Sequence, residues 1–115
     1  FPMRSLHYLN TFVPSGYAFV SVDVRGTGAS FGGRPVDLID REVQDFAEIA
    51  AWTKAQPFCN GRIGTGGISY DGITGALMAA QGNITAAALL FAPGDIFEDI
   101  AFVGGIPTIG FVDMY

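Results

Sequence analysis

Basic residues, cysteine and histidine are scarce in this sequence. It holds six Lys and Arg against eleven Asp and Glu, which gives a net charge of −5. Because a protein that binds nucleic-acid phosphates needs a basic surface, this balance argues against a nucleic-acid partner. Cys59 is the single cysteine, so the chain has no internal disulfide and no cysteine-based zinc site. His7 is the single histidine and has no neighbouring ligand pattern, and we therefore expect no metal and no other cofactor.

Long hydrophobic runs are also missing. The two most apolar stretches, residues 84–92 and 102–112, are too short or too interrupted by glycine and proline to cross a bilayer, so we expect no membrane partner. No basic segment followed by an apolar run opens the sequence, and the compartment stays open. What the chain does hold is apolar: 50% of its 115 residues are hydrophobic and 15% are charged, as in the interior of a globular domain. This length fits one domain at most.

Three apolar runs, at residues 17–23, 62–66 and 85–91, predict strands of a sheet, and the first two are expected to be buried. Between them the residue spacing predicts two helices. One is amphipathic and covers residues 40–55, and the other is rich in small residues and covers residues 73–81. Strands that alternate with helices are typical of parallel βαβ units. The sequence therefore predicts the α/β class.

The helix expected over residues 40–55 carries two local predictions. Asp37 and Asp40 are candidates for its N-terminal cap, because short acidic side chains accept hydrogen bonds from the first N–H groups of a helix. Phe46 and Trp52 are expected in the core, on the apolar face of the same helix.

A glycine-rich loop is expected over residues 25–33. Arg25 in this loop could touch a substrate, but we favour a structural ion pair with Glu42 or Asp45 on the following helix. A nucleotide-binding G-x-G-x-x-G pattern would need glycine at the position of Ser69, and no lysine of the Walker type follows. The glycines therefore do not predict a nucleotide site.

Ser69 is the most informative residue of the chain. It lies in Gly67-Ile68-Ser69-Tyr70-Asp71-Gly72, between a predicted strand and a predicted helix. A serine on a sharp strand-to-helix turn presents its hydroxyl above the sheet, as acyl-transferring serine hydrolases hold their nucleophile. The backbone N–H of Tyr70, at the start of the helix, is the natural first donor to an oxyanion. In the common G-x-S-x-G pattern the second glycine follows the serine by two positions, where this chain has Asp71.

Several motifs surround this serine in a fixed order. They are Gly16-Tyr17-Ala18, Asp23-Val24-Arg25-Gly26-Thr27-Gly28-Ala29-Ser30, Gln56-Pro57-Phe58, Asn60-Gly61-Arg62-Ile63-Gly64 and Gly67-Ile68-Ser69-Tyr70-Asp71-Gly72. Over residues 11–105 the chain resembles the CocE/NonD hydrolases, the α/β-hydrolase family of cocaine esterases, X-prolyl dipeptidyl aminopeptidases and α-amino acid ester hydrolases. The resemblance implies a partial α/β-hydrolase fold with a nucleophile elbow. Residues 1–94 would belong to its core, and residues 95–115 would lead into a helical cap.

The resemblance also implies a function. A serine hydrolase of this family cleaves ester or amide bonds of small molecules or short peptides through an acyl-enzyme, here on Ser69. Tyr70 matches the residue whose backbone N–H lines the oxyanion hole. The triad acid and histidine are expected beyond Tyr115, since His7 precedes the serine whereas α/β-hydrolases run in the order serine, acid, histidine. The second oxyanion donor, a tyrosine hydroxyl in the family, is expected before residue 1.

Two interpretations remain open. The first is an active hydrolase as a full-length protein, with the 115-residue chain alone expected to be inactive because it lacks the base. The second is a truncated or degenerate hydrolase module that serves as a non-catalytic binding or structural domain.

Asp95, Glu98 and Asp99 could determine specificity, but a solvated or capping role is the default for them. Asp71 could interact with a substrate amine, but its position at the start of a helix favours an interaction with the helix dipole first.

Overall fold

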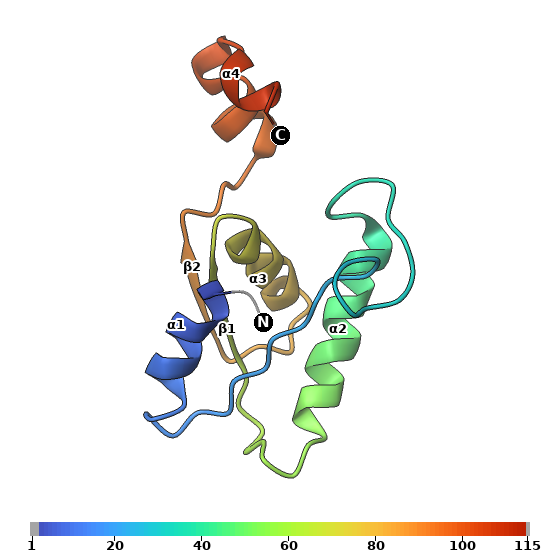
Figure 1. Cartoon of the computed structure of the whole chain (residues 1–115), viewed down its shortest axis with the longest axis vertical. Helices are drawn as coiled ribbons and strands as arrows, with labels where there is room; N and C mark the ends of the chain where they lie inside the picture. The colour runs from blue at the N-terminus through green and yellow to red at the C-terminus, as the bar shows by residue number, and fades with distance from the viewer. Residues whose placement is uncertain (1–2, 115) are drawn as a thin grey trace. The chain divides into compact units, whose positions relative to one another are not determined.

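The structure, a computed structural model, describes residues 3–114 and divides into two compact units, Phe1–Ile63 and Gly64–Tyr115. The first unit contains two helices, α1 (Met3–Phe12) and α2 (Asp40–Lys54), joined by a long irregular segment. The second contains β1 (Gly64–Ile68), α3 (Tyr70–Ala80), β2 (Ala86–Leu90), η1 (Phe97–Ala101), η2 (Val103–Gly105) and α4 (Ile109–Val112) (Figure 1).

The second unit is built on a strand–helix–strand segment. β1 and β2 pair in parallel, in a register that runs from Gly64 opposite Ala86 to Ile68 opposite Leu90. The connecting helix α3 packs against both strands (Figure 1). The predicted strand–helix–strand order and the α/β class are confirmed for this segment, and α3 begins directly after Ser69 rather than at residue 73.

The prediction that the strand before Ser69 is buried is wrong for this unit. All five residues of β2 are exposed, and in β1 only Gly67 is buried. Thr65 and Leu89 lie on the side of α3, because a side chain on Gly75 of that helix would meet both of them. Parallel strands are buried when helices cover both faces of the sheet, and within this unit α3 covers one face.

The strand expected over residues 17–23 is not formed. The backbone is irregular from residue 17 to residue 24, between α1 and the glycine-rich loop. A strand is held by hydrogen bonds to a neighbouring strand, and no other strand occurs among the described residues of this unit. The β-branched and aromatic composition of this run therefore was not sufficient for a strand here.

Helix α2 agrees with its prediction within one residue, but its predicted caps are wrong. Ile39 occupies the N-cap position, and no side chain caps the helix there. Asp40 is the first helical residue, and Asp37 forms an ion pair with Arg34 at 2.8 Å instead. Asp40 still lies in the first turn, where a negative charge interacts favourably with the helix dipole.

One stripe of α2 is buried. Phe46 is 4% and Ala50 is 1% exposed, and Glu42 lies one turn earlier on the same stripe and is fully buried. The expectation for Phe46 is confirmed. Trp52 was also expected in the core, but it is 55% exposed. The reason is the helical period: two residues after Ala50 the helix has turned by about 200°, away from the buried stripe.

The buried carboxylate of Glu42 is compensated by neighbours from the preceding loop. It accepts hydrogen bonds from Arg34 Nη1 at 3.1 Å and from the N–H of Leu38 at 3.0 Å. Leu38 adopts a φ of +63°, a conformation that few leucines take. A buried charge costs free energy unless it is paired and hydrogen-bonded, so this contact fixes the end of the loop on α2.

Replacing Arg34 with alanine is expected to lower the free energy of unfolding by about 3 kcal/mol or more, because Glu42 would lose the cation that balances its buried charge. Urea denaturation followed by circular dichroism measures the change. Arg41→Ala is the matched control. Arg41 is 59% exposed, its ion pairs are 4.0 Å long, and its loss should cost at most about 1 kcal/mol. Equal effects of the two substitutions would contradict this view of Glu42.

Among residues 3–114, no helix combines the length and the apolar character that crossing a bilayer requires.

Candidate active site

Ser69 forms the turn between β1 and α3. The strand ends at Ile68 and the helix begins at Tyr70, so strand, serine and helix follow one another as the sequence predicts. Ser69 has a φ of 60° and a ψ of −122°, a region that residues other than glycine rarely occupy. Such a conformation costs about 1–3 kcal/mol and persists where the surrounding structure enforces it. Ser69 is exposed at this point of the chain.

Two backbone hydrogen bonds hold this serine in place. Its N–H donates to the carbonyl oxygen of Leu90 at 3.0 Å, which ties the turn to the end of β2. Its carbonyl oxygen accepts from the N–H of Ile73 at 3.0 Å, which is the first hydrogen bond of α3. Ser69 is thus fixed on one side by the neighbouring strand and on the other by its own helix.

A side chain would overlap its neighbours at Gly67 and would be tightly packed at Gly72. A Cβ on Gly67 would lie 2.6 Å from the carbonyl carbon of Asp71. A Cβ on Gly72 would lie 3.1 Å from the carbonyl oxygens of both Gly67 and Leu90. Because Gly67 has no side chain, the Cβ of Asp71 fits beside it, at the position where the common pattern has its second glycine.

Gly67→Ala is expected to lower the free energy of unfolding by about 1–3 kcal/mol, because the new methyl group overlaps the backbone of Asp71 and the turn must move. Gly64→Ala, on the same strand, is the control. Its Cβ would lie 3.6 Å from the carbonyl oxygen of Ala86, an ordinary contact, so the change should stay below about 1 kcal/mol. Urea denaturation compares the two. Equal stability of both variants would show that the turn tolerates a side chain at residue 67.

Tyr70 and Asp71 form the first turn of α3, directly after the candidate nucleophile. The N-terminus of a helix carries a partial positive charge, which stabilises a nearby negative charge. The exposed carboxylate of Asp71 lies at that end of the helix, so the expected dipole interaction fits its position.

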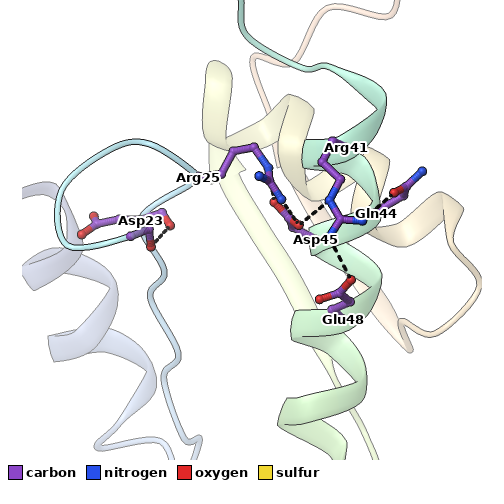
Figure 2. A network of polar contacts seen from close by, with 7 residues as sticks. Asp23, Arg25, Arg41, Gln44, Asp45 and Glu48 are labelled. Atoms are coloured by element: carbon purple, nitrogen blue, oxygen red, sulfur yellow. Dashed lines mark hydrogen bonds and ion pairs between the residues drawn. The ribbon is translucent and has the colours of Figure 1, made fainter. Parts of the chain in front are cut away.

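Arg25 forms the expected structural ion pair. Its Nε donates to Oδ2 of Asp45 at 2.7 Å and its Nη2 donates to Oδ1 at 2.6 Å (Figure 2). The hydrogen bond to Asp45 raises the pKa of the Arg25 guanidinium above its ordinary value. Of the two predicted partners, Asp45 is therefore the one observed, and Glu42 binds Arg34 instead. A two-point contact of this kind sets the orientation of the guanidinium as well as its position.

Asp23 holds the other part of the glycine-rich loop. Its Oδ2 accepts a hydrogen bond from the N–H of Ala29 at 3.1 Å, and its carbonyl oxygen accepts one from Ser30 Oγ at 2.6 Å. A side chain on Gly28 would collide with the Asp23 carboxylate. The shape of the loop is thus set by its own polar contacts and by its link to α2.

Asp95 and Asp99 have the capping role expected as the default. Asp95 Oδ1 accepts hydrogen bonds from the N–H groups of Phe97 at 2.8 Å and Glu98 at 3.1 Å. Asp99 Oδ2 accepts from the N–H groups of Gly94 at 2.8 Å and Asp95 at 2.9 Å. The two carboxylates therefore satisfy the N–H groups where η1 begins.

His7 and Cys59 are the single histidine and the single cysteine of the chain, two residue types that commonly bind metals. His7 is exposed on α1, as expected for a surface helix residue, and its ring meets Tyr8 edge to face at 6.1 Å. Cys59 is partly buried and is a free thiol. In the part of the chain from residue 3 to residue 114, no group of three or more His, Cys, Asp or Glu residues could hold a metal ion.

Sequence reasoning missed Leu90 and Ala92 as neighbours of Ser69. The carbonyl oxygen of Leu90 accepts a hydrogen bond from the Ser69 N–H. Ala92 lies beside Gly72, because a Cβ added to Gly72 would be 3.0 Å from the Cβ of Ala92. The signal was present in part, because residues 85–91 were predicted as a strand parallel to the one before Ser69. The register that brings Leu90 to Ser69 was not contained in that prediction.

The sequence is similar to several known hydrolases. A Mycobacterium bovis protein, provisionally named a serine esterase, is 44% identical over 106 residues, which are 90% of this chain and 17% of that protein. Cocaine esterase of a Rhodococcus strain is 36% identical over 89 residues, 76% of this chain and 15% of that protein. A Streptomyces avermitilis protein, provisionally named an Xaa-Pro dipeptidyl-peptidase, is 35% identical over 91 residues, 67% of this chain and 14% of that protein.

The chain therefore spans about 17% of the length of the first curated relatives that it matches. No solved structure gives a significant match. A family model described as X-Pro dipeptidyl-peptidase (S15 family) matches residues 2–114. Because this match covers nearly the whole sequence, the chain belongs to the X-Pro dipeptidyl-peptidase family of hydrolases, and the expected membership in the CocE/NonD group is confirmed.

Proposed function

We propose that Ser69 is the nucleophile of a serine hydrolase that cleaves ester or amide bonds through an acyl-enzyme. In the first step Ser69 Oγ attacks the carbonyl carbon of the substrate, and its proton passes to a histidine base. The bond to the leaving group then breaks, and the leaving alcohol or amine takes up the proton. Water releases the acyl group from Ser69 in the second half of the reaction.

The observation that carries this proposal is the backbone of Ser69. The residue stands exposed in a one-residue turn between a parallel strand and a helix, at a φ of 60° and a ψ of −122°. Serine nucleophiles of α/β-hydrolases occupy a strained strand-to-helix turn of this kind. A serine that only filled a corner of the fold would have no need of a conformation that costs stability.

The N–H of Tyr70 is the proposed first donor to the oxyanion. It belongs to the residue after the nucleophile and to the first turn of α3, where the helix dipole favours the negative charge that develops on the carbonyl oxygen. Removing one such donor from a hydrolase costs about two to three orders of magnitude in kcat. The strained turn at Ser69 and the start of the helix at Tyr70 thus both act in the step in which Ser69 attacks the carbonyl carbon.

The remaining groups of the proposed site lie outside residues 1–115. The triad acid and histidine would follow residue 115, and the second oxyanion donor would precede residue 1, as the family resemblance implies. In this proposal residues 1–94 belong to the α/β-hydrolase core and residues 95–115 lead into a cap. The substrates would be small esters, amides or short peptides, in keeping with the esterase and peptidase names of the relatives.

Labelling with a fluorophosphonate probe tests the nucleophile. The full-length protein is expected to react at Ser69, and Ser69→Ala is expected to abolish labelling, because the probe forms a covalent bond only with an activated serine. Ser21→Ala is the matched control, since Ser21 is exposed on the irregular segment before the glycine-rich loop.

The result depends on the fold as well as on the serine, so circular dichroism must show that both variants are folded. A folded wild-type protein that stays unlabelled would overturn the proposal and favour the non-catalytic module. Labelling that persists in Ser69→Ala would show that the nucleophile is another serine.

A further inference from the structure

Phe91 combines two unusual features at the end of β2. Its φ is +50°, which is an outlier for a bulky aromatic residue. Its side chain is 88% exposed. The backbone conformation costs free energy, and the exposed ring gains little from burial. The packing of the described residues therefore explains neither feature.

The position of Phe91 relates it to the candidate nucleophile. Ile68 and Leu90 are opposite one another in the parallel sheet, and the carbonyl oxygen of Leu90 accepts the N–H of Ser69 at 3.0 Å. One residue further along each strand lie Ser69 and Phe91. Phe91 is therefore the residue that directly follows the hydrogen-bond partner of the Ser69 N–H.

The chain is anchored on both sides of Phe91. Leu90 is bound to the Ser69 turn, and Ala92 packs against the start of α3, where a Cβ on Gly72 would lie 3.0 Å from the Cβ of Ala92. Phe91 must make the turn between these two fixed points. The same contacts that hold Ser69 in its strained conformation thus also hold Phe91 in a left-handed one.

We propose that Phe91 is a specificity residue that contacts the acyl group of the substrate and favours apolar acyl groups larger than acetyl. This inference rests on the proposed function of Ser69 and names the acyl group that the site prefers. An exposed aromatic ring at the end of β2, on the residue after the one that binds the Ser69 N–H, offers an apolar surface to whatever is attached to the attacked carbonyl carbon. Strained backbone is typical of residues that act on a ligand.

The test compares two esters with the same leaving group, p-nitrophenyl acetate and p-nitrophenyl hexanoate, on the full-length protein. In Phe91→Asn the ratio of kcat/KM for hexanoate to that for acetate is expected to fall about tenfold, as expected when an apolar contact to the substrate is lost. Asparagine accepts a positive φ, so this variant keeps the turn while it removes the ring. Phe91→Met keeps an apolar side chain and is expected to retain most of the ratio.

Two readouts separate a specificity residue from a packing residue. The melting temperature of Phe91→Asn is expected to be no lower than that of the wild type, because the strain is relieved and little buried surface is lost. Ile84→Ala, which removes an apolar side chain two residues before β2 begins, is the control and is expected to leave the ratio at its wild-type value.

The inference is overturned if Phe91→Asn labels normally at Ser69 but keeps the wild-type ratio. It is also overturned if the melting temperature falls by several degrees while the ratio is unchanged, because Phe91 would then pack against another part of the protein. An unlabelled wild-type protein would instead overturn the function proposed for Ser69. The failure of the inference and the failure of the function are therefore distinguishable.

Discussion

The close approach of β1, α3 and β2 around Ser69 is the constraint on which the candidate site depends. A Cβ on Gly67 would overlap the backbone of Asp71, and a Cβ on Gly72 would lie 3.1 Å from the carbonyl oxygens of Gly67 and Leu90. The Ser69 N–H donates to the carbonyl oxygen of Leu90. Because Gly67 has no side chain that would overlap α3, the helix can begin immediately after the serine. The conformational strain of Ser69 is the local cost of this close packing, and the proposed chemistry uses the exposed hydroxyl and the helix start that result from it.

The first unit is organised by charge pairs more than by a large apolar core. Arg25 and Asp45 hold the beginning of the glycine-rich loop on α2 (Figure 2). Arg34 with the buried Glu42 holds the segment that follows this loop. Such pairs require correct geometry, because a buried carboxylate without its partner is strongly destabilising. The loop is therefore a structured element, in spite of its many glycines.

Local pattern in the sequence was enough for α2, for the strand–helix–strand segment and for the turn at Ser69, because each depends on residues close together in the chain. What failed depended on neighbours from elsewhere. Residues 17–23 have the composition of a strand but no strand to pair with, and β1 lacks a second covering layer. Trp52 is the exception, because the helical period alone places it off the buried stripe. The sequence did not identify Leu90 and Phe91 as neighbours of Ser69 for the same reason as the two strands, because their position depends on the register between two strands.

The most direct test of the central claim is to trap the acyl-enzyme. The full-length protein is quenched in acid during turnover of a slowly deacylated ester, such as p-nitrophenyl pivalate, digested with trypsin and examined by mass spectrometry. The account predicts the acyl group on Ser69, in the peptide that begins at Ile63 after the last basic residue of the sequence, Arg62. Turnover with the acyl group on a different residue, or with an unmodified Ser69 throughout, would contradict it.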